Sequence, residues 1–267
     1  MDEQHDVIGD LTTSGVLGAF KWAYESAVFR TLADHSEAAG HNATTLGVTR
    51  HALFTNRLDR VFSCGRYSRG ADFDDTLNLD MLLAELPGVD AASLPQIDPH
   101  LVERSDLHGS PGWMFNGRRF LIAACQFGQL ETLPWSRKSP TKQLAALQGN
   151  PDAIQDSLFA GSIDDEMFAL LASATGDSKL DLETLIVAHT LDGISGQREL
   201  ALGRAKLNFS GGRAWHWRED LLTSSIQNSS IGVVNPNCVS GKDVVEDAPV
   251  RLRTTNGQGA GAGNGGN

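Results

Sequence analysis

Apolar residues in the first part of the chain recur with the spacing of amphipathic helices. Between Ser14 and Ala33 they fall every three or four residues, which places them on one face of a helix. A second helix is predicted from Ala43 to Phe62, after a break at Gly40. The apolar face of the first helix comprises Leu17, Phe20, Tyr24, Val28 and Leu32, and the polar face of the second carries Arg50, Arg57 and Arg60.

The middle of the chain carries the signals of short helices and of a β-hairpin. A leucine-rich helix is predicted from about Leu77 to Leu86, where Pro87-Gly88 ends it, and a further helix is expected to begin near Ser162. Asn116-Gly117 indicates a hairpin, because this pair adopts the positive φ angles that a type I′ turn requires. The second strand, Phe120 to Phe127, is apolar on both faces and is therefore expected in the centre of a sheet.

Two strands and a helix are predicted near the end of the patterned region. The strands run from Leu182 to Leu191 and from Arg198 to Leu207, and the helix from Arg213 to Leu222. We therefore expect a single α+β domain over residues 1–222, with N-terminal helices packed on an antiparallel or mixed sheet. Residues 223–267 are expected to form an irregular extension, disordered from about residue 256, where Gly and Asn dominate.

Composition narrows the classes of function. The 267 residues carry a formal net charge of -11, which argues against coating nucleic acid by bulk electrostatics but allows a local basic groove. Three cysteines without metal-ligand spacing indicate neither a disulfide framework nor a structural zinc site. The polar N-terminal residues lead us to expect no signal peptide, and no apolar stretch reaches membrane-spanning length. We therefore expect a cytoplasmic protein with no membrane partner.

The predicted strand-strand-helix unit contains polar residues in an order that permits metal-assisted hydrolysis. His189 lies near the end of the first strand, Asn208 at the exit of the second, and His216 on the predicted helix. This order resembles the ββα-metal (HNH-type) nuclease hairpin, although Ala188 stands where such hairpins usually have a second His or an Asp. The resemblance implies that His189 is the general base and that Asn208 braces the loop which aims it. It further implies that His216, with Asp192, binds Mg²⁺ or another divalent cation. The alternative is that His189 is a polar residue of a sheet and His216 a spacer between two tryptophans.

A basic segment offers a second functional feature. Residues 135–142 combine cations, hydroxyls and an aromatic ring, a composition suited to holding phosphate and stacking a base. Arg118 and Arg119 are candidates to extend this patch. Its nucleic-acid-binding residues within the segment would be Trp135, Arg137, Lys138 and Lys142. A solvated loop that balances Glu131 and nearby acids is the alternative.

Three functions remain open on the sequence. The first is a divalent-metal nuclease acting on DNA or RNA, with His189 as its base. The second is a non-catalytic module that binds a protein or nucleic acid through exposed tryptophans, for which Trp135, Trp215 and Trp217 are candidates. The third is a structural subunit of an intracellular assembly, whose acidic surface keeps it in solution.

Overall fold

The computed structural model describes residues 3–68, 80–148, 180–208 and 211–223. Contacts separate the chain into a unit of residues 1–228 and a unit of residues 229–267, and the second unit lies outside the described residues. The predicted C-terminal disorder and the predicted helix near Ser162 also lie outside them. Of the predicted helix from Leu77 to Leu86, the structure describes the part from Asp80, where residues 80–83 are helical.

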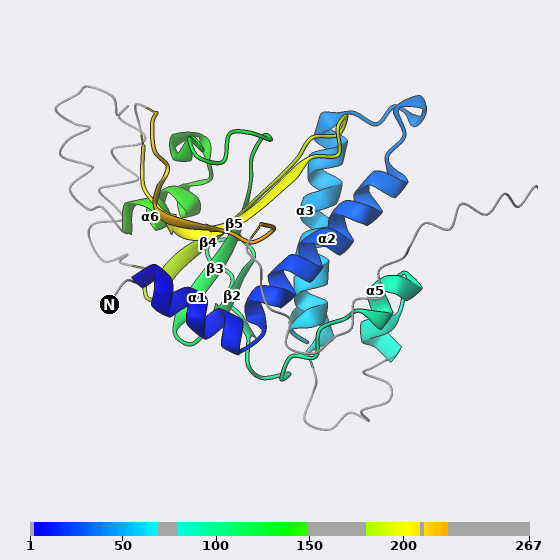
Figure 1. Ribbon diagram of the computed structural model, residues 1–267, viewed down its shortest axis with the longest axis horizontal. Coiled ribbons are helices and arrows are strands. Elements are labelled where there is room, and N and C mark those ends of the chain that lie inside the picture. The colour runs from blue at the N-terminus through cyan, green and yellow to red at the C-terminus, as the bar shows by residue number, and fades with distance from the viewer. Residues whose placement is uncertain (1–2, 69–79, 149–179, 209–210, 224–267) are drawn as a thin grey trace, which may run out of the picture. The chain divides into compact units, whose positions relative to one another are not determined.

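A six-stranded mixed sheet forms the centre of the fold, with strands in the order β1-β2-β3-β4-β5-β6 (Figure 1). The central neighbours β3 and β4 run parallel, and every other pair is antiparallel. The predicted α+β class with a mixed sheet is confirmed. The strands are β1 (Glu103–Arg104), β2 (Gly112–Phe115), β3 (Arg118–Ala124), β4 (Glu183–Leu191), β5 (Arg198–Ala205) and β6 (Trp215–Asp220).

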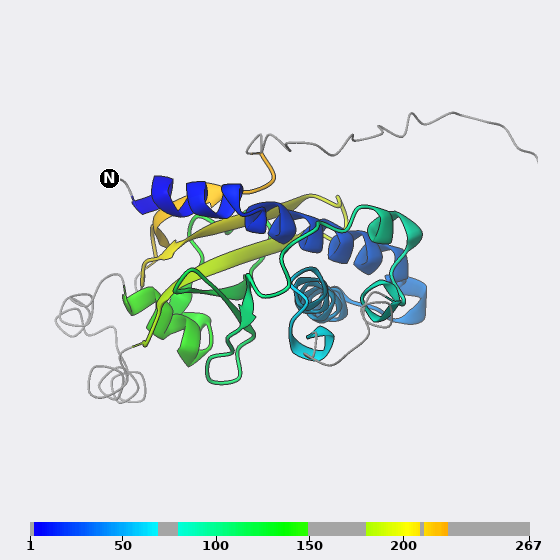
Figure 2. The same cartoon turned by 90° about the horizontal axis from the view of Figure 1, so that it is seen from below.

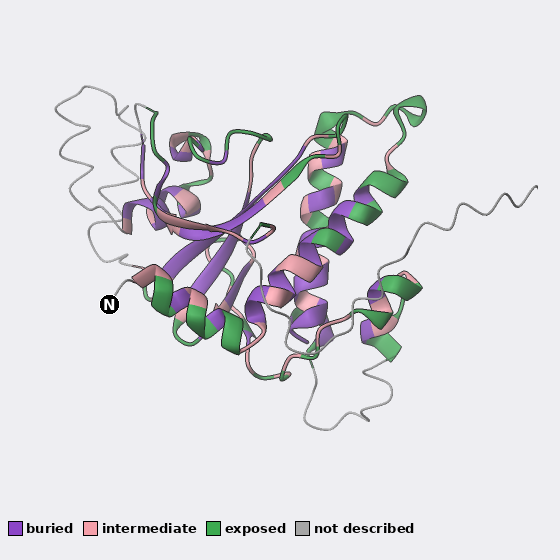
Figure 3. Cartoon of the chain, in the orientation of Figure 1, coloured by how far each residue is buried: buried purple, intermediate pink, exposed green. Residues whose placement is uncertain are grey.

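Three N-terminal helices cover one face of the sheet: α1 (Glu3–Thr13), α2 (Val16–Asp34) and α3 (Ala43–Val61). Phe20 of α2 links the layers, because its ring lies 5.5 Å from Phe120 of β3 and 5.7 Å from Phe62 at the end of α3. The helical periodicity of the sequence thus identified both α2 and α3. Figure 3 shows buried residues along the facing sides of these helices and the strands.

The opposite face of the sheet is covered by η3 (Trp135–Arg137) and α6 (Pro140–Gln148). In Figure 2 the strands lie between the blue helices α1 and α2 and the green helix α6. The rings of Trp135 and Trp215 meet edge to face at 5.3 Å in this second core. The remaining short elements are η1 (Glu37–Ala39), η2 (Gly65–Tyr67) and α5 (Gly88–Ala92). In the part of the chain that the structure describes, no helix is long and apolar enough to cross a membrane.

The Asn-Gly hairpin forms as predicted. Asn116 and Gly117 have φ angles of 48° and 74°, and Phe115 pairs with Arg118 across the turn. Both angles are positive, as a type I′ turn requires. The following strand β3 is buried along its length and pairs on both sides, so its predicted central position is confirmed.

The predicted helix from Arg213 to Leu222 is wrong, because this segment forms β6, antiparallel to β5. Trp215 packs into the second core, whereas Trp217 packs beside the N-terminal helices on the other face. His216 is skipped by the pairing of β5 with β6, which identifies it as the extra residue of a β-bulge. The two aromatic rings gain burial on both faces of a strand, and this outweighs the helical spacing of the short segment.

The polar face predicted for α3 is also wrong, because Arg50, Arg57 and Arg60 are all buried. Arg57 Nε donates to Ser26 Oγ at 2.8 Å, and that hydroxyl donates to the Asp90 carboxylate at 2.5 Å. Arg60 Nη1 donates to the carbonyl oxygens of Met81 and Leu82. These two arginines therefore attach the segments around residues 81 and 90 to α3.

Candidate functional site

His189 lies in the core between the sheet and the N-terminal helices, with none of its surface exposed. Its ring is stacked on His51 at 5.9 Å, with 24° between the planes, and it meets Phe54 edge to face at 5.2 Å. Tyr24 lies 5.9 Å away on α2. Neither ring nitrogen of His189 has a hydrogen-bond partner among the described residues. Burial, and then the charge of Arg50, holds the pKa of His189 well below its ordinary value, so the ring is neutral.

The other residues of the predicted nuclease hairpin lie away from His189. His189 is paired with Leu200 on β5, whereas His216 lies opposite the Arg204–Ala205 step, which places the two histidines about 18 Å apart by strand geometry. Asp192 occupies the exposed turn after β4, where its carboxylate accepts hydrogen bonds from Ser195 and Ile194. Within the described ranges, no three His, Cys, Asp or Glu side chains lie together in a geometry that could hold a metal ion.

Asn208 braces a different loop from the one that the sequence hypothesis assigned to it. Its Oδ1 accepts a hydrogen bond from the backbone N–H of Trp135 at 3.2 Å. Its Nδ2 donates to the carbonyl oxygens of Leu133 and Gly212, each at 3.2 Å. The side chain therefore joins the segment before α6 to the segment before β6.

Two of the three tryptophans that were candidates for an exposed binding surface are buried. Trp135 and Trp215 are fully buried, and their indole nitrogens donate to the carbonyl oxygens of Ala214 and Leu130, each at 2.7 Å. Trp217 is partly buried beside the first core. The segment from Trp135 is not a solvated loop either, since it forms η3 and the start of α6. The observation that suggested a protein partner is therefore removed for Trp135 and Trp215.

The predicted basic patch is divided between the two ends of β3. Arg118 and Arg119 lie at its start and are paired with carboxylates there. Lys138 lies at its end, where its Nζ donates to the carbonyl oxygen of Ala124 at 2.6 Å. Six residue steps of strand separate the two ends by about 20 Å. The acidic partners of the two arginines are Asp10, Glu183 and Asp181.

Four basic side chains gather at the carboxyl ends of the parallel strands β3 and β4. Two come from α3, one from the loop before α6, and one from the first turn of α6. Lys138 and Arg50 donate to the carbonyl oxygens of Ala124 and Leu191, which are close to each other. Ala124 is paired with His189, and Leu191 lies two residues beyond His189, so Ala124 and Leu191 are about 8 Å apart. We call these residues the basic cluster: Arg50, His51, Lys138 and Lys142.

The basic cluster has hydrogen-bonding capacity that the fold does not use. Arg50 is buried and donates from Nη1 to the carbonyl oxygen of Leu191 at 3.5 Å, whereas its Nε has no partner in the described part of the chain. Among the described residues, no carboxylate forms an ion pair with any of the four. Glu199, whose carboxylate lies at the same end of β5, accepts hydrogen bonds from Gly128 and Thr190 instead.

The charges of the basic cluster destabilise one another. Burial lowers the pKa of His51, and the Lys142 and Arg50 charges lower it further. Burial, and then Lys138, likewise lowers the pKa of Lys142, and burial lowers that of Lys138. The cluster therefore concentrates positive charge in partly dehydrated surroundings, where a bound anion would lower the free energy of its charged members.

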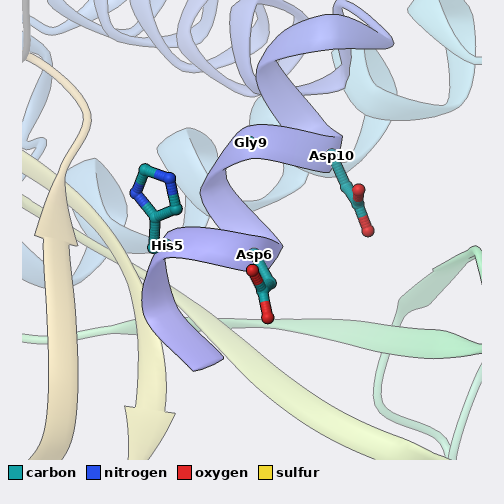
Figure 4. A pocket seen from close by; sticks show the side chains of 4 residues that line it. All are labelled: His5, Asp6, Gly9 and Asp10. Atoms are coloured by element: carbon teal, nitrogen blue, oxygen red, sulfur yellow. The ribbon is translucent and has the colours of Figure 1, made fainter. Parts of the chain in front are cut away.

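Two surface depressions lie elsewhere. One, of about 400 Å³, is lined by His5, Asp6, Gly9 and Asp10 of α1 (Figure 4). Asp10 is already engaged there, since it pairs with Arg118 and accepts a hydrogen bond from Asn116.

The second depression, of about 40 Å³, lies between the end of α2 and the start of α3 and includes His35 and His41, whose rings are 5.6 Å apart. His41 Nδ1 accepts a hydrogen bond from Ser36 N–H, so in the neutral ring Nε2 carries the proton. A metal ion bound through Nε2 would require the opposite tautomer. Neither depression has the unpaired buried donors of the basic cluster.

Comparison with known proteins adds no assignment. No protein-family model matches the sequence, and no curated protein and no solved structure shows significant similarity to it. The function is therefore argued from the geometry of the basic cluster.

The sequence did not single out His51, although it identified its neighbour in space, His189. Arg50 read as part of the polar face of α3, and the approach of Arg50 and His51 to Lys142 depends on a contact between segments about 90 residues apart. The one local signal is Lys138 followed by Lys142 at the spacing of a helical turn.

Proposed function

We propose that this chain binds nucleic acid through the phosphate groups, at the basic cluster. The observation that supports the proposal is a set of four neighbouring basic groups that have no carboxylate partner among the described residues. Phosphate oxygens would supply the missing countercharge for Arg50 and the lysines. The carboxyl ends of parallel strands are also where open α/β sheets commonly bind ligands.

A single-stranded segment suits this site better than a duplex. His51 is partly exposed and offers a planar ring of the kind on which unstacked bases stack. The net charge of -11 repels an extended polyanion over much of the remaining surface. A short flexible strand can place one or two phosphates at the basic cluster without following the acidic surface.

Binding is favoured over the metal-dependent nuclease predicted from the sequence. The nuclease hypothesis needs His189 and His216 at one ion or one scissile phosphate, whereas they lie about 18 Å apart across β4, β5 and β6. The burial of Trp135 and Trp215 likewise removes support for a protein-binding module. Phosphate binding depends on neither feature.

The test is the fluorescence anisotropy of labelled single-stranded RNA, single-stranded DNA and duplex, titrated with the protein at several salt concentrations. The informative variant is Lys138→Gln/Lys142→Gln. Lys206→Gln is the matched control, because Lys206 is also half-buried, has no ion pair among the described residues, and lies just after β5, at the opposite end of the sheet.

We expect the wild-type protein and Lys206→Gln to bind single strands with the same salt dependence. The double variant should bind more weakly at low salt, and the slope of log K against log salt should shrink by about 0.7 for each phosphate group that the variant no longer neutralises. Equal binding by the double variant and the wild type would contradict the assignment. Metal-dependent loss of substrate during the titration would favour the nuclease hypothesis instead.

A further inference from the structure

His51 differs from the other members of the basic cluster because it can exchange a proton near neutral pH. Its ring is fixed by the stack on His189 and by its place on α3. The lysines of the cluster come from the opposite layer of the fold, so an anion bound between α3 and α6 would touch both sides. A base beside several cations is the combination that phosphodiester transfer requires.

Resting on the phosphate site proposed above, we propose that the basic cluster cleaves RNA by internal transesterification, with His51 as general base. His51 would accept the proton of a ribose 2′-hydroxyl while the 2′-oxygen forms a bond to the adjacent phosphorus. The bond from phosphorus to the 5′-oxygen breaks, and the leaving oxygen takes a proton from the Lys142 ammonium group. The products are a 2′,3′-cyclic phosphate and a 5′-hydroxyl, and water then returns His51 and Lys142 to their starting protonation states.

Each remaining member of the basic cluster has a defined part in this step. Lys138 and Arg50 stabilise the negative charge that grows on the non-bridging oxygens of the phosphorus. Arg50 is buried and its Nε has no acceptor among the described residues, so it acts on this charge through its own positive charge from behind the site. His189 lies beneath the ring of His51 without access to solvent and acts as a positioning residue.

The electrostatic surroundings suit His51 as the base. The groups that face it are Arg50 on its own helix, Lys142 on α6 and neutral His189 on β4. Burial and the two charges lower its pKa below the ordinary value of 6.5, so the ring is unprotonated at pH 7 and free to accept a proton. The same surroundings lower the pKa of Lys142, which makes its ammonium group a stronger acid.

The test uses the full chain in EDTA with a DNA strand that contains one ribonucleotide, beside an all-DNA strand and a 2′-O-methyl strand. The variants are His51→Gln and Lys142→Gln, and the control is His5→Gln, an exposed residue on α1, which packs beside β6. Thermal melting establishes that each variant is folded. Anisotropy with the uncleavable 2′-O-methyl strand measures binding separately from cleavage.

We expect the wild-type protein and His5→Gln to cut only at the ribonucleotide, leaving a cyclic phosphate. The His51→Gln variant should cut the strand at least about 100-fold more slowly than the wild type, while still binding the 2′-O-methyl strand. The rate should rise with pH on the acidic side and level off below pH 6.5. If His51→Gln fails to fold, Lys142→Gln must show the loss of rate.

Four results would overturn the inference. Binding without cleavage refutes the catalytic step and leaves the phosphate site intact, whereas no binding refutes both. Equal cleavage by all variants indicates a contaminating ribonuclease. In a parallel reaction with Mg²⁺ in place of EDTA, cleavage of the all-DNA strand indicates metal-dependent hydrolysis instead.

Discussion

Replacement of His189 by leucine is expected to stabilise the protein. His189 lies in a row of apolar residues on β4, fully buried, and both of its ring nitrogens lack partners among the described residues. An unsatisfied buried polar group costs about 1–3 kcal/mol, and an exchange of similar volume costs less than about 1.5 kcal/mol in repacking. We therefore expect His189→Leu to raise the free energy of unfolding by about 1 kcal/mol at pH 7.

The pH dependence of this gain is a more decisive test than its magnitude, because the pH dependence does not depend on how leucine packs in the core. Folded His189 has a pKa well below 6.5, so only the unfolded chain takes up this proton as the pH falls below that value. Stability associated with neutral His189 is present above pH 6.5 and is lost as the pH falls through the window below it. Between pH 7 and pH 5.5 the advantage of leucine should grow by about 1.3 kcal/mol.

Urea denaturation of both proteins at the two pH values measures this effect. The matched comparison cancels the contributions of groups that do not contact His189. A destabilised His189→Leu protein, or a difference that does not change with pH, would refute the reasoning. Such a result would mean that His189 has a polar partner in the folded state.

Two further changes test the packing around the site. Gly203→Ala places a methyl group against the Trp217 carbonyl oxygen and 2.8 Å from the Trp215 ring. The free energy of unfolding, measured by urea denaturation, should therefore fall by at least about 2 kcal/mol. A wild-type value would contradict the register of β5 with β6. Asn208→Ala removes the hydrogen bonds to Trp135, Leu133 and Gly212 and should lower the free energy of unfolding by about 2 kcal/mol. RNA binding measured by anisotropy should stay unchanged. Weaker RNA binding at unchanged stability would instead support the role that the sequence hypothesis gave this residue.

Local sequence signals predicted the elements whose stability depends on local chemistry. The helices α2 and α3 have apolar stripes long enough to identify them. The Asn116-Gly117 turn needs two positive φ angles that few other pairs adopt. The burial of β3 on both faces followed from its unbroken apolar run.

The errors arose where tertiary contacts decide the structure. The six residues of β6 show both helical and strand spacing, and the pairing with β5 selects the strand. Arg57 and Arg60 read as surface charges, but Ser26 of α2 accepts from Arg57, and the segment around residue 81 returns over α3 to accept from Arg60. A polar residue whose partner lies far along the chain cannot be distinguished by spacing from one that faces water.

The candidate site was predicted only in part for the same reason. Lys138 and Lys142 were identified from local composition, and His189 from its place at the end of a strand. Arg118 and Arg119 were grouped with the lysines because they are close in sequence, yet they lie at the other end of β3 and pair with acids. His51 joins the site through a contact between α3 and the sheet.

The most direct test of the basic cluster is NMR of the histidine ring nitrogens during titration with a short 2′-O-methyl RNA strand. The account predicts that the His51 signals shift in a saturable way, while those of His216 on β6 remain in place. Shifts at His216 with none at His51 would contradict the account and place the bound strand at the opposite end of the sheet.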